Sequence, residues 1–212
     1  LVAEHGTSEL HSESLYLAGE ARFRLGQMAA AYELLVQFQK NVRRHAARPK
    51  ALHRLGLVAN SLGEFKTANE ALTELLTSAP EFAQGAEARY QQGIALLGLQ
   101  RIRAARASFR ALLEETQNSD TDGLFTARAR IELGRLDLDS KDYENALSHF
   151  LKVSLLFADG EEVREAKWLS ARVLEAQGET RLAVKNYREL EASAPASTQG
   201  QAASKRLQEL GD

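Results

Sequence analysis

The side chains with the greatest potential for chemistry are histidines and one run of aspartates. The histidines are His5, His11, His45, His53 and His149, and the aspartates are Asp137, Asp139 and Asp142. No two histidines have the four-residue spacing that places two metal ligands on one helical face. The aspartate run lacks the glycine and the distal glutamate of a calcium-binding loop, so Asp142 is interpreted as a helix N-cap. We therefore expect no metal site and no cofactor.

Motifs of nucleophilic catalysis and of phosphate binding are missing as well. The sequence has no cysteine, which excludes disulfides, a thiol nucleophile and cysteine-ligated metal. It contains no GxSxG elbow, no GxxxxGK[ST] loop and no dinucleotide fingerprint. We expect that this chain is not an enzyme, unless it forms the regulatory domain of a longer catalytic chain.

A regularly spaced set of large side chains is more informative. Tyr16, His53, Tyr90, Ile131 and Trp168 follow one another at intervals of 37, 37, 41 and 37 residues. Two sets of small residues keep the same intervals, Gly19, Gly56, Gly93, Gly134 and Ala171 in one set and Ala31, Ala68, Ala105, Ala146 and Ala183 in the other. All three sets share the same intervals, including the third one, which is four residues longer than the others. The chain therefore contains five repeats.

Each repeat reads as two helices joined by a tight turn. Alanine and leucine are abundant and β-branched residues scarce, which favours helices over strands. Turns are predicted at 25–27, 62–64, 140–142 and 177–179, with Gln100 in the turn of the third repeat. The small residues are expected to be buried where helices cross closely. The sequence thus predicts an all-α fold of about eleven helices.

Three sequence runs carry a family resemblance. The first helix reads AEARYQQG from Ala86 and ARARIELG from Ala127, and a second helix reads GEFKTA from Gly63 and ends at Pro80. This pattern resembles the tetratricopeptide repeat family, although its 37-residue period exceeds the usual 34 and Ala171 replaces a glycine. The resemblance implies a right-handed superhelical solenoid of five helix pairs plus a C-terminal capping helix.

The resemblance also implies the domain organisation. Residues 1–212 are expected to form a single array with repeats at about 12–48, 49–85, 86–126, 127–163 and 164–197. Residues 1–8 then correspond to the remnant of a preceding repeat, and residues 198–212 to the capping helix.

In this family the first helix of each pair lines a concave groove, which implies a non-catalytic scaffold that binds a partner helix or extended peptide. The expected partner-binding residues are Tyr16, Glu20, Phe23, His53, Asn60, Tyr90, Leu97, Arg135, Trp168 and Arg172. Alternatively, the aromatic residues are consensus residues that bury themselves against the neighbouring helix. The expected groove lining mixes apolar, basic and acidic residues, so it does not indicate a ligand of one particular charge. A carboxylate clamp is not expected, because Leu17 stands where the clamp requires asparagine, although Lys50 and Arg54 fit it.

Charge distribution leaves a second binding surface open. The net charge of -2 makes nucleic acid an unlikely partner. However, residues 34–63 and 88–113 contain several lysines or arginines and no acidic residue. These runs are either solvated helix faces or a basic patch for an acidic protein.

Apolar side chains near the N-terminus predict a sticky end of the chain. Leu15, Phe23 and Tyr32 are expected to lack a covering neighbour and to support a fragment dimer through residues 1–40. A structural array whose stacking faces mediate self-assembly is the alternative function. No apolar run is long enough to span a bilayer. The repeat units and the final helix resemble bacterial envelope proteins of the Tol–Pal and β-barrel assembly type, which favours the periplasm, with a cytoplasmic scaffold as the alternative.

Overall fold

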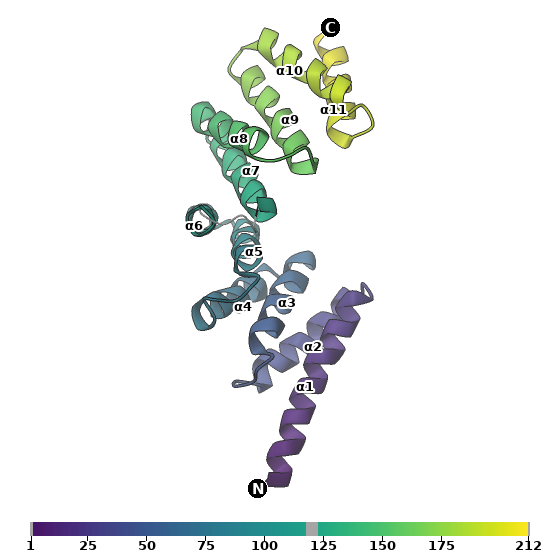
Figure 1. Cartoon of the computed structure of the whole chain (residues 1–212), viewed down its shortest axis with the longest axis vertical. Coiled ribbons are helices and arrows are strands. Elements are labelled where there is room, and N and C mark those ends of the chain that lie inside the picture. Colours follow the sequence, from purple (N-terminus) through teal and green to yellow (C-terminus); the bar gives the residue numbers. More distant parts are fainter. Residues whose placement is uncertain (1, 118–122, 212) are drawn as a thin grey trace. The chain divides into compact units, whose positions relative to one another are not determined.

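The computed structural model describes residues 2–117 and 123–211, with side chains from Leu10 onward in the first stretch. Within these ranges every regular element is a helix (Figure 1). The helices are α1 (Val2–Arg24), α2 (Met28–Asn41), α3 (Arg48–Ser61), α4 (Phe65–Ser78), α5 (Gly85–Gly98), α6 (Ile102–Glu115), α7 (Gly123–Asp139), α8 (Tyr143–Leu156), α9 (Glu161–Ala176), α10 (Thr180–Ser193) and α11 (Thr198–Leu210). The expected all-α fold is confirmed.

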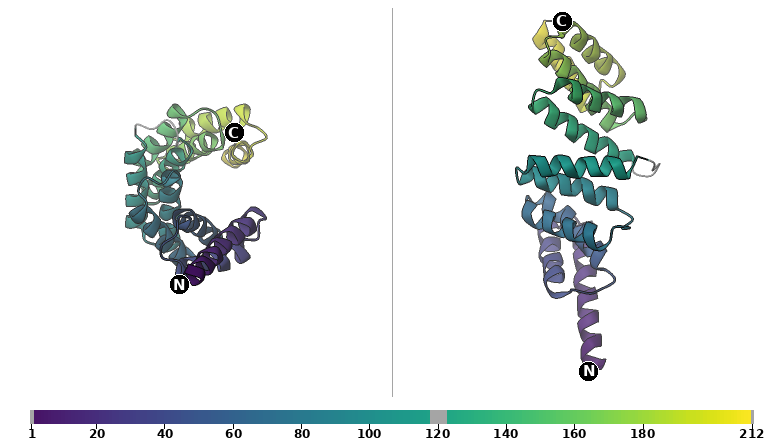
Figure 2. Two further views of the ribbon diagram at one scale, coloured as in Figure 1. Left: turned by 60° about the horizontal axis from the view of Figure 1, so that its bottom comes forward. Right: turned by 90° about the vertical axis from the view of Figure 1, so that its left-hand side faces the viewer.

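The chain forms two compact units, Leu1–Ala111 (unit 1) and Leu112–Asp212 (unit 2). In unit 1, α1 packs against α2 and α3 against α4, while α2 contacts α3 and α4 contacts α5. Unit 2 repeats this order, with α7 on α8, α8 on α9, α9 on α10 and α10 on α11. The antiparallel pairs can be followed within each unit in Figure 2.

The small residues lie where the two helices of a pair cross, as the sequence predicts. The alanines at positions 31, 68, 105, 146 and 183 are completely buried. A Cβ atom on Gly93 would lie 2.3 Å from the Phe109 ring, and one on Gly134 would lie 2.5 Å from Phe150. Each glycine therefore lets an aromatic ring of the second helix pack directly on the backbone of the first.

The turns inside the pairs also lie where the sequence places them. Gly63 and Gly178 adopt positive φ angles of 77° and 83°, a conformation that glycine reaches without strain. Gln100 and Lys141 adopt the same left-handed conformation, at 58° and 60°, in the repeats that have no glycine at this position. Asp142 caps α8, because its side chain accepts a hydrogen bond from the Asn145 amide at 3.3 Å.

The N-terminal flank differs from the expectation. Leu15 is buried in the core, and Tyr32 packs against that core and exchanges a hydrogen bond with Thr67. Phe23 is half-buried beneath the Arg54 guanidinium, whose carbon lies 3.9 Å from the ring centre. The prediction that these side chains form an uncovered flank is therefore wrong, because they point toward α2, α3 and α4 rather than away from them.

The exposed apolar residues of α1 lie on another stripe. Leu10 and Leu17 are 69% and 55% exposed, and Ala21 on the same face is also exposed. Residues 2–8, which the sequence assigns to a preceding repeat, belong to α1. Along the described chain, no helix is long and apolar enough to cross a membrane.

Candidate interaction surface

One face of each unit is formed by the first helices of the pairs, and we call it the inner face. In unit 1, α1 contacts α3 and α3 contacts α5; in unit 2, α7 contacts α9 and α9 contacts α11. Among the described residues of each unit, the backbones of the second helices do not approach one another this closely, and Tyr32 of α2 reaches Thr67 of α4 through a side-chain hydrogen bond. The first helices therefore approach one another more closely, and the residues expected to bind a partner all lie on them.

Glu20 and Phe23 of the inner face of unit 1 are engaged with Arg54 of α3. Arg54 donates to the Glu20 carboxylate at 2.7 Å and 3.1 Å and stacks on the Phe23 ring, while Arg24 donates to Glu20 at 2.8 Å. Burial by itself would raise the pKa of Glu20, but the hydrogen bonds from Arg54 and Arg24 outweigh it and lower that pKa. These residues join α1 to α3 and are only partly accessible to a partner.

His53 and Asn60 hold α3 against α5. His53 is buried, with Nε2 3.2 Å from the Glu87 carboxylate. Asn60 donates its amide hydrogens to the Gln91 carbonyl and side-chain oxygens at 2.8 Å and 2.9 Å. Both residues connect consecutive first helices, which is a structural role.

Tyr16, Tyr90 and Leu97 are half-buried on the first helices of unit 1. The Tyr16 ring lies 6.2 Å from Phe38, and burial raises the pKa of its hydroxyl. The Tyr90 ring lies 5.9 Å from Phe109. Each aromatic residue thus packs one side of its ring on the second helix of its own pair.

In unit 2, Arg135 and the residues around it form a chain of polar contacts from α7 to α11. Arg135 of α7 pairs with Glu165 of α9, and Gln199 of α11 donates to the same carboxylate at 2.9 Å. Ile131, which stands in this repeat where Tyr90 and Trp168 stand in its neighbours, is buried. Burial also raises the pKa of the adjacent Glu132.

Trp168 and Arg172 lie together on α9. The indole is half-buried, 5.1 Å from the Tyr187 ring, and the Arg172 guanidinium lies 5.8 Å from the indole centre. Beneath them, Tyr187 donates to Glu175 at 3.0 Å and Arg206 pairs with the same carboxylate. Hydrogen bonds from Arg206 and Tyr187 therefore lower the pKa of Glu175, and burial raises the pKa of Tyr187.

A hollow of about 320 Å³ opens on this inner face between α9 and α11. Trp168, Arg172, Ala202, Lys205, Arg206 and Glu209 line it. The hollow brings together two residues that the sequence predicts, Trp168 and Arg172, and four that it does not. Its size is at the lower end of the range for small-ligand sites and suits a few side chains of a partner.

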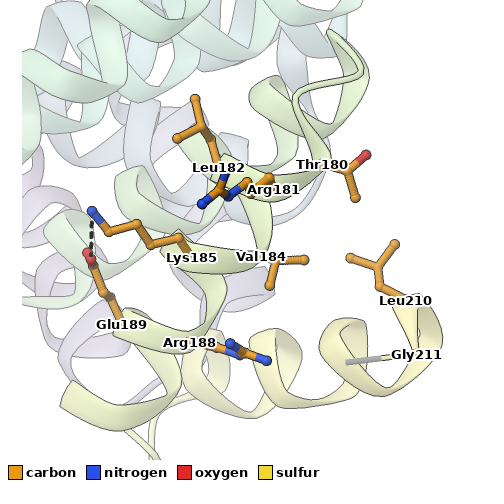
Figure 3. A pocket seen from close by; sticks show the side chains of 9 residues that line it. All are labelled: Thr180, Arg181, Leu182, Val184, Lys185, Arg188, Glu189, Leu210 and Gly211. Carbon is orange, nitrogen blue, oxygen red and sulfur yellow. Dashed lines mark ion pairs between the residues drawn. The ribbon is translucent and has the colours of Figure 1, made fainter.

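A second hollow, of about 790 Å³, lies in unit 2 between α10 and the end of α11 (Figure 3). Leu182, Val184 and Leu210 form its apolar part, and Arg181 lines it as well. Lys185, also at its edge, pairs with Glu189 of the same helix at 3.8 Å. This hollow contains no aromatic residue and none of the residues expected to bind a partner.

The basic runs are partly neutralised. Arg48 donates to Glu74 at 2.7 Å and to the Val42 carbonyl, and Arg54 pairs with Glu20. Lys40, Arg43, Arg44, Lys50, Arg101, Arg103 and Arg110 are exposed. In the run 34–63, some basic residues therefore form ion pairs between helices, and the others are exposed to solvent.

The side chains of Asp137, Asp139 and Asp142 do not converge on one point. Asp137 is buried with its carboxylate 3.6 Å from His149, Asp142 caps α8, and Asp139 is exposed. No group of three or more potential metal ligands occurs among the residues that the structure describes, which exclude the side chain of His5.

Sequence reasoning missed the contacts that join consecutive first helices. Glu20 and Arg54, Arg128 and Glu162, and Glu165 and Gln199 are each 34 residues apart. A search for complementary polar residues at about the repeat length, rather than at helical spacing, would have found them.

The tetratricopeptide repeat family model matches residues 53–120 and, in a second overlapping match, residues 90–154. These matches support the tetratricopeptide repeat family. Among curated proteins, none matches the sequence.

Solved structures agree on the fold. RapI in its apo form is 14% identical over 93% of this chain and 81% of RapI, with a TM-score of 0.75. MamA from Desulfovibrio magneticus is 15% identical over 88% of this chain and 97% of MamA, with a TM-score of 0.71. A Rap protein complexed with Competence and Sporulation Factor is 14% identical over 85% of this chain and 53% of that protein, with a TM-score of 0.63. This chain therefore has the tetratricopeptide-repeat fold.

Proposed function

We propose that this chain is a non-catalytic interaction module that binds a partner helix or extended peptide on the inner faces of its units. Tetratricopeptide repeats generally act as scaffolds for protein interaction. A structure with the same fold, a Rap protein, is bound to Competence and Sporulation Factor. The proposal rests on the position of Trp168, a large aromatic residue that stays partly exposed beside a hollow although a buried tyrosine packs against its ring.

Tyr16, Tyr90 and Leu97 are proposed to contribute on unit 1, where they are half-exposed. Glu20, Phe23, His53 and Asn60 are proposed to act mainly by holding the first helices in place, since their polar or aromatic groups already have partners inside the unit. Arg135 is paired with Glu165, whereas the Arg172 guanidinium lies beside the Trp168 ring, and the nearby Glu175 carboxylate pairs with Arg206.

Site-specific photo-cross-linking tests this proposal. A benzophenone amino acid is introduced at Leu97 or Arg172 on the inner faces and at Arg103 or Arg181 on second helices, and each variant is irradiated in cells. We expect the same partner to be cross-linked from the inner positions and not from the outer ones. A partner captured only from Arg103 would instead favour the basic patch of residues 88–113, and one captured only from Arg181 would favour the surface of α10.

Self-assembly is the second candidate function, and the stripe on α1 favours it. Ser14 and Ala21 are exposed, whereas Ala51 and Val58, their equivalents one repeat later, are buried in the core that α2 and α3 share. A face that a preceding second helix covers elsewhere is thus open on α1, with Leu10 and Leu17 on it. We propose that a second copy of the chain covers it.

Sedimentation equilibrium tests the self-assembly proposal. Leu17→Glu is expected to convert dimers to monomers, and Leu155→Glu, at a site 80% exposed on α8, serves as the matched control. A parent protein that remains monomeric at high concentration would exclude dimers through this stripe.

A bacterial envelope location is a separate proposal, which the resemblance of the repeat units and the final helix to envelope proteins supports. Fractionation of cells that express the natural gene tests it. Recovery in the periplasmic or membrane fraction is expected, and recovery in the cytosol alone would contradict it.

A further inference from the structure

The hollow between α9 and α11 exists because one repeat lacks an acidic side chain that the preceding repeat has. Arg135 on α7 pairs with Glu165 on α9, which lies 30 residues later. One repeat further on, 37 residues along, the equivalent positions are Arg172 on α9 and Ala202 on α11. The arginine is kept and its carboxylate is replaced by a methyl group.

This replacement leaves Arg172 without an ion pair and opens space beside it. Along the described chain, neither Arg172 nor Lys205 forms an ion pair, and both are exposed. Arg206, the third cation of the hollow, is neutralised by Glu175 and by Glu209, to which it donates at 2.6 Å. The only acidic side chain in the lining is therefore already paired, and two cations remain unpaired around Ala202.

Trp168 forms the apolar wall of the same hollow. It packs against both the α7–α9 core and the α9–α11 core and rests on the fully buried Tyr187, so its indole is held in one position. An aromatic ring fixed in this way offers contact area at little cost in side-chain entropy.

We propose that this hollow binds an acidic segment of a protein partner, with a partner carboxylate taking the position that Glu165 occupies in the preceding repeat. The carboxylate pairs with Arg172 and Lys205, and a neighbouring apolar side chain of the partner packs on Trp168. This inference rests on the proposed function and adds the chemistry of the partner. Residues on α9 and α11 alone form the site, so it lies entirely within unit 2.

Trp168 is the only tryptophan in the sequence, so intrinsic fluorescence reports directly on the hollow. The probe is the peptide acetyl-Asp-Leu-Asp-Phe-Asp-amide, and the comparison peptide has asparagine in place of each aspartate. We expect the acidic peptide to change Trp168 emission and to bind at least about tenfold more tightly than the neutral peptide, with an affinity that falls as salt increases. Equal affinity for the two peptides would overturn the proposal.

Three substitutions locate the binding. Arg172→Gln is expected to lower the affinity for the acidic peptide about tenfold, because it removes one of the two unpaired cations. Ala202→Glu is expected to lower this affinity at least as much, since the new side chain restores the internal carboxylate and fills the hollow. Arg181→Gln, which removes an exposed arginine of the hollow between α10 and the end of α11 (Figure 3), is expected to have no effect on peptide binding.

The controls make each result decisive. Circular dichroism of each variant verifies that the helices are retained, and both inner substitutions are on exposed or half-exposed helix surface. Loss of binding in Arg181→Gln equal to that in Arg172→Gln, or displacement of the peptide by acetate at the same carboxylate concentration, would contradict recognition of a partner segment. If cross-linking finds a partner on the inner faces while the acidic peptide does not bind, the interaction module stands and the acidic chemistry is excluded.

Discussion

Gly93 has no side chain because the ring of Phe109 occupies the space where a Cβ atom would lie. Gly93→Ala is expected to destabilise the protein by about 1–2 kcal/mol, since overpacking costs about 1–3 kcal/mol and the gain in helix propensity returns at most about 1 kcal/mol. Gly85→Ala in the same helix is the matched control, because its Cβ would meet nothing within 4 Å. Thermal denaturation of both variants measures the difference. A lower melting temperature for the control than for Gly93→Ala would contradict this account of the crossing.

Glu132 gives a prediction with a defined dependence on pH. Burial raises the pKa of Glu132, Arg135 partly offsets the rise and Glu165 adds to it. The pKa of Glu132 is higher in the folded protein than in the unfolded chain. Protonation of this carboxyl therefore contributes to the free energy of unfolding, and the contribution is fully present below the pKa of the unfolded chain. It is lost as the pH rises through the folded value. Glu132→Gln, which places here the residue that stands at the equivalent Gln91, is expected to stabilise the protein at pH 7.

Urea denaturation of the Glu132→Gln variant and its parent at pH 7 and pH 4 measures this effect. The gain in the free energy of unfolding is expected at pH 7 and should shrink at pH 4, where the parent carboxyl is largely protonated. A variant that is less stable than its parent at pH 7 would show that the charge of Glu132 contributes to the fold.

At the scale of elements, the small residues fix how closely two helices of a pair approach. Ala146 of α8 is fully buried in the core that α7, α8 and α9 share. Ala146→Leu is expected to cost about 1–3 kcal/mol, whereas Lys152→Leu, on the exposed side of the same helix, should change stability by less than about 0.5 kcal/mol. Chemical denaturation compares the two, and an unchanged midpoint for Ala146→Leu would refute the register of the repeats.

The helices and their crossings could be predicted because steric requirements repeat along the chain. A glycine or alanine at every crossing and a left-handed residue at every turn leave a periodic signal in one sequence. The direction of Leu15, Phe23 and Tyr32 could not be predicted in the same way. Their orientation depends on where α2, α3 and α4 lie in space, and a helical period alone does not distinguish two adjacent faces of α1.

The candidate site was only partly predictable for a related reason. Trp168 and Arg172 follow from the register of the first helices, but the pairing of Glu20 with Arg54 and of Arg206 with Glu175 depends on distances between helices. The hollow itself comes from a missing side chain at Ala202, which becomes visible only when Arg135 and Glu165 are seen to pair.

At the scale of the whole molecule, the sequence assigns different charge to the two units. Residues 1–111 carry an excess of basic residues and residues 112–212 an excess of acidic ones. Yet the inner face of the acidic unit 2 presents two unpaired cations beside an aromatic ring. The local arrangement of side chains, rather than the net charge of a unit, therefore determines which partner chemistry its surface favours.

Partner binding on the inner faces, rather than on the basic residues of runs 34–63 and 88–113, can be tested directly. Calorimetric titration of the partner identified by cross-linking, against the parent chain and three variants, tests it most directly. Trp168→Ala is expected to weaken binding about thirtyfold, or roughly 2 kcal/mol, and Arg172→Ala to weaken it less, while Arg103→Ala on α6 should leave the affinity within about twofold. Loss of affinity in Arg103→Ala with unchanged binding in Trp168→Ala and Arg172→Ala would contradict the inner-face account and establish the basic outer surface in its place.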